Sequence, residues 1–178
     1  MINQLFDNFE RSEFSDEIFS VFGRALTIAT RFDASTKTLA RLPLYKLAVV
    51  GRNTLSDDEY NQLIQNVSKK HSNLNRAIDS LKLNEDINNL LTHARESRNE
   101  LIHEATLGYI GGFDGMSQQE LSQLLGHVKG LVVNIIKGEV LISAIISIQN
   151  GEPISNYQFS REYESKYSNW VMERFDQE

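Results

Sequence analysis

Apolar residues recur at intervals of three and four along most of this 178-residue chain. That spacing places them on one face of an α-helix, whereas a half-buried strand would alternate apolar and polar residues. Segment 18–42 is a clear example, with Ile18, Phe22, Ala25 and Ala29 at helical spacing. The pattern predicts an all-α fold, and 40% hydrophobic residues are enough to fill one core.

Start and stop signals in the first half of the chain predict two helices. The first begins near Ser15 and ends before Pro43, because proline breaks a helix interior. Residues 44–50 fit either a strand or a last helical turn. Ser56 and Glu59 then have the spacing of a capping box, which predicts a helix from this point to about Leu81.

The second half of the chain predicts two more long helices and a short one. Asn84 is the expected N-cap of a helix that ends near Leu107, with Gly108 as its C-cap. Ser117 and Glu120 form another capping-box pattern, which opens a helix of roughly 48 Å that ends at Gln149. Residues 163–174 predict a short terminal helix. We therefore expect one domain, residues 1–178, built as an antiparallel bundle of four main helices plus a short C-terminal helix.

The second half of the long helix is apolar nearly all round. One core cannot face every side of a helix, so the pattern predicts that a homodimer interface buries the remainder. The residues concerned are Val132, Val133, Ile135, Ile136, Val140, Ile142, Ile145 and Ile146.

Composition narrows the possible functions. The formal charge is −6, so a broad basic face for duplex DNA is not expected and any RNA site must be local. The chain has no Cys, which excludes disulfides and thiolate zinc sites. Residues 1–10 contain no basic residue and no long apolar run, and polar residues interrupt the apolar stretch 131–148. We expect a cytoplasmic protein with no membrane association.

The stretch with the clearest chemistry is 94–104, in the third expected helix. In steps of 100°, Arg98 falls within the apolar stripe of this helix, and Arg95 lies in a neighbouring sector. Asn99 and His103 are four residues apart and therefore adjacent on one face.

These residue types suit work on a phosphodiester. A guanidinium sheltered by apolar neighbours holds a phosphate more strongly than one in water, and Arg98 could stabilise charge on the phosphorus. His103 could transfer protons as a general acid or base, with Asn99 orienting it and Arg95 contacting RNA. One such His per chain does not supply both an acid and a base, but a two-fold dimer brings a second.

The pattern Arg98-Asn99-x-x-x-His103 resembles the R-x4-6-H signature of the HEPN (higher eukaryotes and prokaryotes nucleotide-binding) superfamily. The polar residue directly after Arg and the expected helical bundle are also typical of that superfamily. Arg and His at this spacing alone would arise by chance about 0.7 times in such a chain, and requiring Asn after Arg lowers this to about 0.06.

The resemblance implies a metal-independent RNA endonuclease that needs no cofactor and works as a homodimer with a composite cleft. Arg98 and His103 would be catalytic and Asn99 an orienting residue. It also implies a toxin or phage-defence effector, with an antitoxin or defence-complex partner. One toxin subgroup carries Tyr two residues after the His, where this chain has Ala105. Some members are inactive, so a catalytically inert interaction module in a defence or regulatory complex is the alternative.

Other patterns fit different or simpler roles. Glu100-x-x-His103 has the spacing of a di-iron ligand pair, but a second such motif is absent. The loop 108–115 lacks the G-K-[ST] of a phosphate-binding loop and reads as a helix connection. The run 69–71 (Lys-Lys-His) predicts a solvated helix face, or else a contact to RNA backbone.

Aromatic residues near the C-terminus leave two interpretations open. They could stack on bases, although such residues more often hold a terminal segment against a bundle. They are Tyr157, Tyr163, Tyr167 and Trp170. His93 is expected at the surface, on a different side of its helix from Arg98.

Overall fold

The computed structural model describes residues 12–103, 105 and 113–173, and this part of the chain is helical without any strand. The all-α prediction is therefore confirmed. In chain order the elements are α1 (Glu13–Val50), η2 (Arg52–Thr54), α2 (Asp57–Lys69), α3 (Leu74–Ser80), α4 (Glu85–His103), α5 (Gln118–Asn150), η3 (Asn156–Phe159) and α6 (Arg161–Met172).

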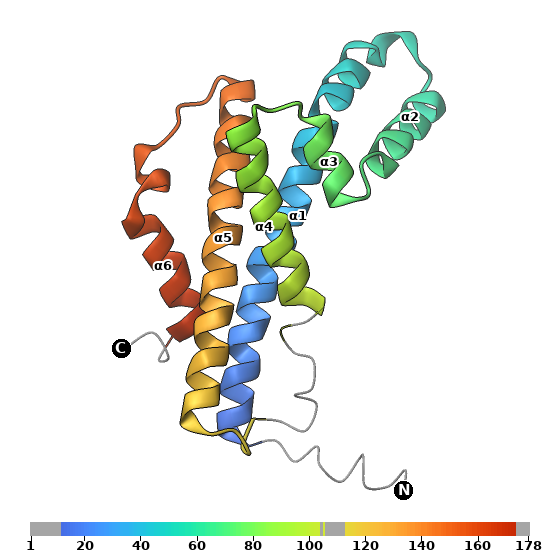
Figure 1. Ribbon diagram of the computed structural model, residues 1–178. Helices are drawn as coiled ribbons and strands as arrows, with labels where there is room; N and C mark the ends of the chain where they lie inside the picture. The colour runs from blue at the N-terminus through green and yellow to red at the C-terminus, as the bar shows by residue number, and fades with distance from the viewer. Residues whose placement is uncertain (1–11, 104, 106–112, 174–178) are drawn as a thin grey trace, which may run out of the picture.

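Three long helices form the centre of the bundle. Figure 1 shows α1 and α5 running in the same direction, with α4 antiparallel to both of them. Helix α6 packs on another side of α5, and α3 packs against α1 and α4 (Figure 1). The bundle is thus antiparallel between chain neighbours, but its two longest helices are parallel because an even number of reversals separates them.

Helix α5 is buried within one chain more completely than its sequence predicted. Of the eight apolar residues that the sequence divides between the core and a dimer interface, five are buried and the other three are half-buried. The reason is that α1, α4 and α6 surround α5 on three sides. One chain thus covers most of this apolar surface, and the homodimer stays a prediction.

Among the described helices, α5 is the one that is long and apolar enough to cross a membrane by length and composition. The polar residues within 131–148 were expected to exclude a membrane span, but they are too few to make the helix fail this test of composition. In this structure 44% of its most apolar window is buried, and the window lies among three other helices. The central helix of a bundle passes the same composition test, so the test does not decide whether α5 crosses a membrane.

Most of the expected helix ends are confirmed. Ser56 and Ser117 each accept a hydrogen bond from the backbone N–H three residues on, while Glu59 and Glu120 bond back. These bonds from the Ser backbone and hydroxyl groups lower the pKa of both glutamates. Gly151 ends α5 in the left-handed conformation, with φ 71°.

Other expected ends were right within a few residues or lie outside the description. Asn84 caps α4, since its Oδ1 accepts from the N–H of Ile87 at 2.9 Å. The short terminal helix is present as α6, and it begins two residues earlier than predicted. Leu107 and Gly108, the predicted end of α4, lie outside the described residues.

The predicted stop at Pro43 was wrong. Helix α1 continues through Pro43 to Val50, so residues 44–50 are helical. A proline inside a helix removes one backbone hydrogen bond and typically costs about 3 kcal/mol. Tertiary contacts on both sides offset this cost: Leu39 is buried before the proline, and Lys46 donates to the carbonyl of Gln149 at 2.8 Å after it. That carbonyl is at the C-terminal end of α5, where a cation is favourable.

The single helix predicted from Ser56 to Leu81 is broken into α2 and α3. His71, at φ 50°, turns the chain after α2. Asn73 then caps α3 by accepting from the N–H groups of Asn75 and Arg76. A left-handed residue followed by a new N-cap ends one helix and begins the next.

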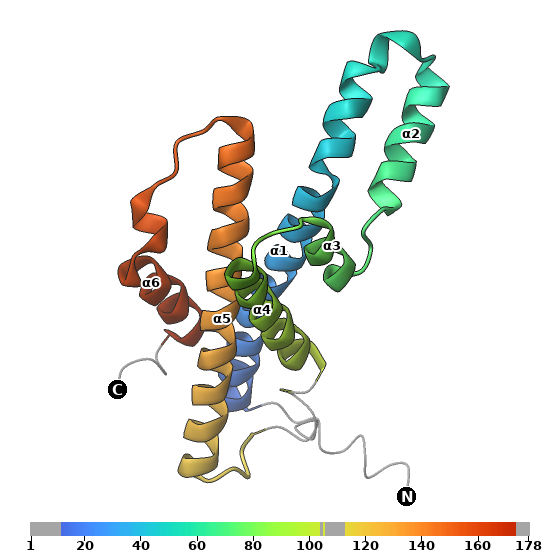
Figure 2. The same cartoon turned by 45° about the horizontal axis from the view of Figure 1, so that its top comes forward.

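Helix α2 and the last turn of α1 form an arm, residues 47–69, that projects from the bundle (Figure 2). Only Ala48 and Val67 are buried along it, and α2 packs mainly against α1. Several apolar side chains of α1 remain exposed on the arm, including Val50 at 81%.

Helices α1, α4 and α5 approach closely at Gly138 of α5. A Cβ atom built there would lie 2.5 Å from Cβ of Ala94 in α4 and 2.9 Å from Cε2 of Phe32 in α1. Cβ atoms do not approach this closely, so the three helices pack at this spacing because residue 138 has no side chain.

We expect Gly138→Ala to lower the free energy of unfolding by about 1–3 kcal/mol, because the added methyl forces α4 and α1 away from α5. The control is Gly130→Ala on the same helix, which is exposed and has no neighbour within 4 Å. That change should raise stability by about 0.5–1 kcal/mol through helix propensity alone. Urea unfolding followed by circular dichroism measures both, and equal effects of the two substitutions would contradict the packing described.

Candidate functional site

The motif residues lie on the C-terminal half of α4, at the surface of the bundle. Arg98 is half-buried, with 22% of its side chain exposed, and Ser97 and Leu101 beside it are buried. Asn99 and His103 are exposed. The helical-wheel placement of Arg98 within the apolar stripe therefore agrees with the structure only in part, since the side chain is half-buried.

Arg98 has two partners that the sequence analysis did not assign. Its guanidinium donates to Oδ1 of Asn99 at 3.0 Å, and its other terminal nitrogen lies 3.4 Å from Oδ1 of Asp33 in α1. Asp33 is bound more closely by Lys37, whose Nζ lies 2.6 Å from Oδ2. The half-buried carboxylate of Asp33 thus forms ion pairs with both Lys37 and Arg98, and the contact with Arg98 is the longer one.

Arg95 lies one turn before Arg98 and links α4 to α3. Its guanidinium donates to Oδ1 of Asn75 and lies 3.2 Å from Oε1 of Glu96. With Lys37 and Arg98, this group holds three cations against the two carboxylates of Asp33 and Glu96. A third carboxylate, Asp79, accepts a hydrogen bond from Nδ2 of the same Asn75 at 3.0 Å, so cations and carboxylates in this network are equal in number.

Three polar atoms in this group are buried without a hydrogen-bond partner among the described residues. They are Nε of Arg95, Nε of Arg98 and Oδ1 of Asp33. Buried polar groups are normally satisfied, and those that are not often mark sites with a role beyond stability. The side chains of Arg95 and Arg98 are each 22% exposed, although their Nε atoms are themselves buried.

A second histidine lies close to the motif, and the sequence analysis missed it. Nε2 of His127 in α5 lies 2.6 Å from Oε1 of Glu100 in α4, and both side chains are exposed. His103 follows Glu100 by three residues and shares its side of the helix. The capping and periodicity signals could not find this pair, because its residues are 27 positions apart.

The chain between α4 and α5 is described only in part. Residues 104 and 106–112, including most of the expected glycine-rich connection, lie outside the described residues. Phe113 is fully buried, and Asp114 accepts from the hydroxyls of Ser12 and Ser15 at the start of α1. The end of the connection is thus fixed to the opposite end of α1 from the arm.

A buried glutamate joins α1, α5 and α6 away from the motif. Oε1 of Glu139 accepts from Nε of Arg31 at 2.8 Å and from Ser35 at 3.3 Å, and its side chain is only 12% exposed. Burial raises the pKa of Glu139 and outweighs the opposing charge of Arg31. Burial and the hydrogen bond with Tyr167 raise the pKa of nearby Tyr163 to about 12.

The C-terminal aromatic residues fall into two groups. Tyr163 and Tyr167 pack against the core cluster, as the anchoring interpretation predicted. Tyr157 and Trp170 are 41% and 47% exposed. The anchors at the end of α6 are Val171 and Met172, which are buried.

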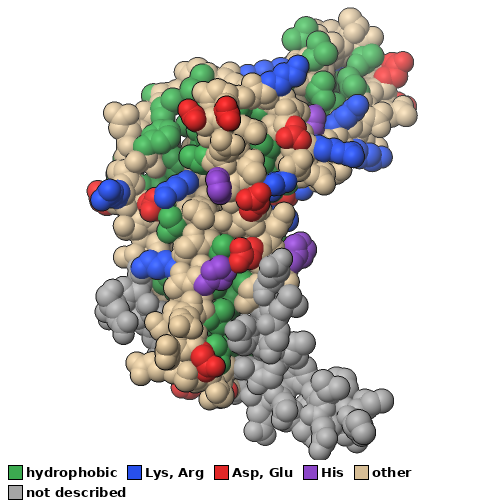
Figure 3. Space-filling model, in the orientation of Figure 1, with side chains coloured by type: hydrophobic (Ala, Val, Ile, Leu, Met, Phe, Trp, Pro, Cys, Tyr) green, Lys and Arg blue, Asp and Glu red, His purple; other side chains and the backbone are tan. Residues whose placement is uncertain are grey.

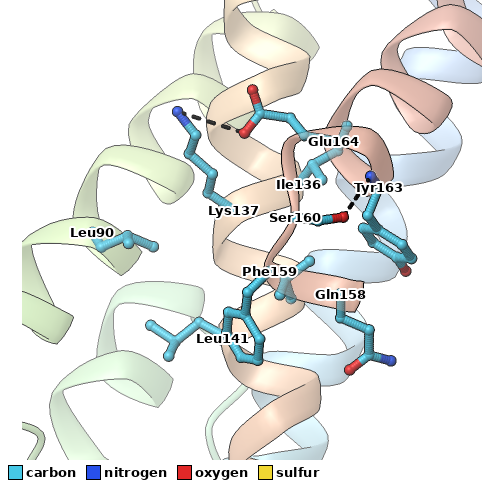
Figure 4. A pocket seen from close by; sticks show the side chains of 10 residues that line it. Leu90, Ile136, Lys137, Leu141, Gln158, Phe159, Ser160, Tyr163 and Glu164 are labelled. Atoms are coloured by element: carbon cyan, nitrogen blue, oxygen red, sulfur yellow. Dashed lines mark hydrogen bonds and ion pairs between the residues drawn. The ribbon is translucent and has the colours of Figure 1, made fainter. Parts of the chain in front are cut away.

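A pocket of about 210 Å³ lies between α4, α5, η3 and α6 (Figure 4). Its walls are mainly apolar, and the rim carries Lys137 and Glu164 at 3.8 Å. None of the predicted site residues lines it. The pocket is therefore separate from the motif on α4 and offers little that would bind a phosphodiester.

The remaining candidates show little that points to chemistry. His93 is exposed, as expected. Within the described residues, no group of three or more His, Asp or Glu side chains is placed to hold a metal, so the Glu100-x-x-His103 pair has no further ligands there.

Comparison with known proteins adds no assignment to this geometry. No family model, no curated protein and no solved structure matches the chain. The function must therefore be argued from the residues around α4.

We expect Arg98→Met to change the free energy of unfolding by at most about 1 kcal/mol, because its 3.4 Å contact is long and Asp33 keeps Lys37. Lys37→Met is the matched control, since it removes the closer cation and should cost more. Urea unfolding of both variants checks this. A larger loss for Arg98→Met would mean that Arg98 chiefly holds α4 to α1.

The raised pKa of Glu139 predicts a specific pH dependence of stability. Above its usual value of 4.5 and up to the raised pKa, the folded protein binds this proton more tightly than the unfolded chain. Stability relative to Glu139→Gln should therefore fall as pH rises through this range and then level off. Urea unfolding over a pH series measures the difference, with Glu152→Gln at an exposed position as the control for charge removal. A difference that stays constant with pH would refute the assignment.

Proposed function

We propose that this chain is a metal-independent RNA endonuclease of the HEPN type, with Arg98 and His103 as catalytic residues and Asn99 orienting Arg98. The observation that supports it best is the pair of half-buried arginines on α4, Arg95 and Arg98. Their side chains are partly exposed, and they lie next to an exposed Asn99 and His103. A phosphate would accept hydrogen bonds from their terminal nitrogens.

The chemistry follows from these positions. An imidazole takes the proton of the ribose 2'-hydroxyl, whose oxygen then forms a bond to the adjacent phosphorus. The bond from phosphorus to the 5'-oxygen breaks, and a protonated imidazole gives that oxygen a proton. Arg98 stabilises the extra negative charge on the phosphorus centre, and Arg95 holds a neighbouring phosphate. The products are a 2',3'-cyclic phosphate and a 5'-hydroxyl.

The reaction needs two imidazoles, and we propose that a homodimer supplies them as the two copies of His103. A composite cleft would bring His103 of one protomer beside the Arg98 of its partner. His127, held by Glu100, is the alternative source within one chain. Such an enzyme would act in the cytoplasm as a toxin or phage-defence effector, restrained by an antitoxin or a complex partner.

The contact of Arg98 with Asp33 favours a second candidate, an inactive HEPN-type interaction module. A guanidinium held by an internal carboxylate can serve packing alone, and the two side chains are only 22% and 16% exposed. In that case α4 would present Asn99 and His103 to a partner in a defence or regulatory complex and would not cleave RNA.

The test is cleavage of total RNA by the purified protein in EDTA. We expect His103→Ala and Arg98→Met each to lower the cleavage rate by about 10²–10⁴-fold, the range typical of a lost proton-transfer or charge-stabilising group. His93→Ala is the matched control, because His93 is an exposed histidine of the same helix outside the motif. The 3' ends of the fragments should carry cyclic phosphate.

Further outcomes separate the alternatives. Equal rates for wild type and His103→Ala, or no cleavage by either, would support the interaction module. If the site needs both copies of His103, adding an excess of His103→Ala chains to wild type should lower the activity of the wild-type chains, because mixed dimers carry only one such imidazole. Loss of cleavage in His127→Ala without such inhibition would assign the second imidazole to His127.

A further inference from the structure

We propose that Arg41, Lys69, Lys70 and Arg76, at the base of the arm, form a binding surface for the backbone of a single RNA strand, which continues to Arg98. We call these four residues the basic surface. They come from α1, from the C-terminal end of α2 and its C-cap, and from α3, and Figure 3 shows Lys and Arg side chains gathered where these elements meet.

The first observation is a segment without acidic residues, which ends at Asp79, the hydrogen-bond partner of Asn75. Residues 60–78 contain no Asp or Glu, although the whole chain has more acidic than basic residues. The exposed positions in this segment are mostly amides and hydroxyls, which donate hydrogen bonds to phosphate and sugar oxygens. They include Asn61, Gln62, Gln65, Asn66, Ser68, Ser72, Asn73 and Asn75.

The second observation is that these cations are not neutralised. Among the described residues none of the four has an ion-pair partner, whereas most arginines of the bundle are paired with carboxylates, as Arg24 is with Glu173 and Arg31 with Glu139. Unpaired cations that share a surface raise the local potential and attract a polyanion.

The third observation is that a hydrogen bond between α1 and the end of α2 fixes the geometry of the basic surface. Nε of Arg41 donates to the carbonyl of Lys70 at 2.6 Å, which fixes the end of α2 to α1. His71 next to it has φ 50°, a conformation that costs free energy in a non-glycine residue. The turn therefore presents Lys69 and Lys70 from a defined position on the bundle.

The fourth observation is continuity with the motif. Asn75, next to Arg76, is bonded by Arg95, and Arg98 follows one turn later on α4. On α1 the positions of Asp33, Lys37 and Arg41 are four residues apart and share one side of the helix. Asp33 and Arg41 are roughly 12 Å apart along the axis, and stacked nucleotides at 3.4 Å cover this distance in about three to four residues.

The surface fits a nucleic-acid strand better than an anionic membrane. Membrane-binding basic helices bury an apolar face in the lipid, and the buried apolar residues of this segment already face the bundle. They are Val67, Leu74, Ala77 and Ile78. The exposed residues of segment 60–78 are thus basic or rich in amides, whereas the exposed apolar residues of the arm, Leu47, Val49 and Val50, lie on the last turn of α1.

The inference rests on the proposed function only for the direction in which the strand runs, so binding is tested apart from cleavage. The probe is a fluorescein-labelled single-stranded RNA with methylated 2'-hydroxyls, which cannot be cleaved by the mechanism above. Fluorescence anisotropy gives its Kd across a salt series for the wild type and for Lys69→Ala/Lys70→Ala/Arg76→Ala. Loss of three phosphate contacts should weaken binding and reduce the slope of log K against log salt by about two units.

The matched control removes the same charge from another face. Lys129→Ala/Arg161→Ala/Lys166→Ala changes three exposed cations of α5 and α6. Equal effects of the two triple variants on Kd and slope would overturn the proposal, as would tighter binding of the wild type to phosphatidylserine vesicles than to RNA. Circular dichroism verifies that both variants are folded, and Lys70→Ala keeps the backbone carbonyl that Arg41 binds.

The two proposals fail in different ways. If the wild type binds the methylated strand through the basic surface but cleaves no RNA, the proposed function is wrong and the basic surface stands. If His103→Ala abolishes cleavage while the triple variant of the basic surface binds and cleaves like wild type, the enzyme stands and this surface does not.

Discussion

The contact of Gly138 with Ala94 and Phe32 sets how the motif helix α4 lies against α1 and α5. It allows α4 and α1 to approach α5 closely, so the three helices share one core. Arg98 lies one turn beyond Ala94, and Asp33 follows Phe32 directly. The close approach at residue 138 therefore brings the guanidinium of α4 to the carboxylate of α1, at the edge of the same core.

Local signals in the sequence were reliable wherever a helix end depends on its own residues. The capping boxes at Ser56 and Ser117 require only a hydroxyl and a carboxylate three residues apart, and both are formed. The helix end predicted at Pro43 was wrong. Proline carries a local free-energy cost in a helix, and tertiary contacts such as that of Lys46 with α5 offset it. The sequence predicted no helix break at His71, because the residue in the left-handed conformation is a histidine and not a glycine.

The candidate site was predictable on one helix and not between helices. The period of α4 placed Arg98 within the apolar stripe, with Asn99 and His103 on a neighbouring face. The partners that define its electrostatics, Asp33 and Lys37, come from a helix more than sixty positions earlier. Glu139, too, reads as an ordinary polar interruption until α1 and α6 close over it. Such pairings depend on tertiary packing, which periodicity does not encode.

The arm, residues 47–69, has one further consequence. The few buried residues of the arm pack almost wholly between α1 and α2. Inserting one helical turn in α1 and one in α2 would therefore lengthen the arm and leave the interior of the bundle unchanged. The length of this hairpin is thus free to vary between related chains. Its reach beyond the core could be tuned by evolution, or by protein engineering, independently of thermodynamic stability.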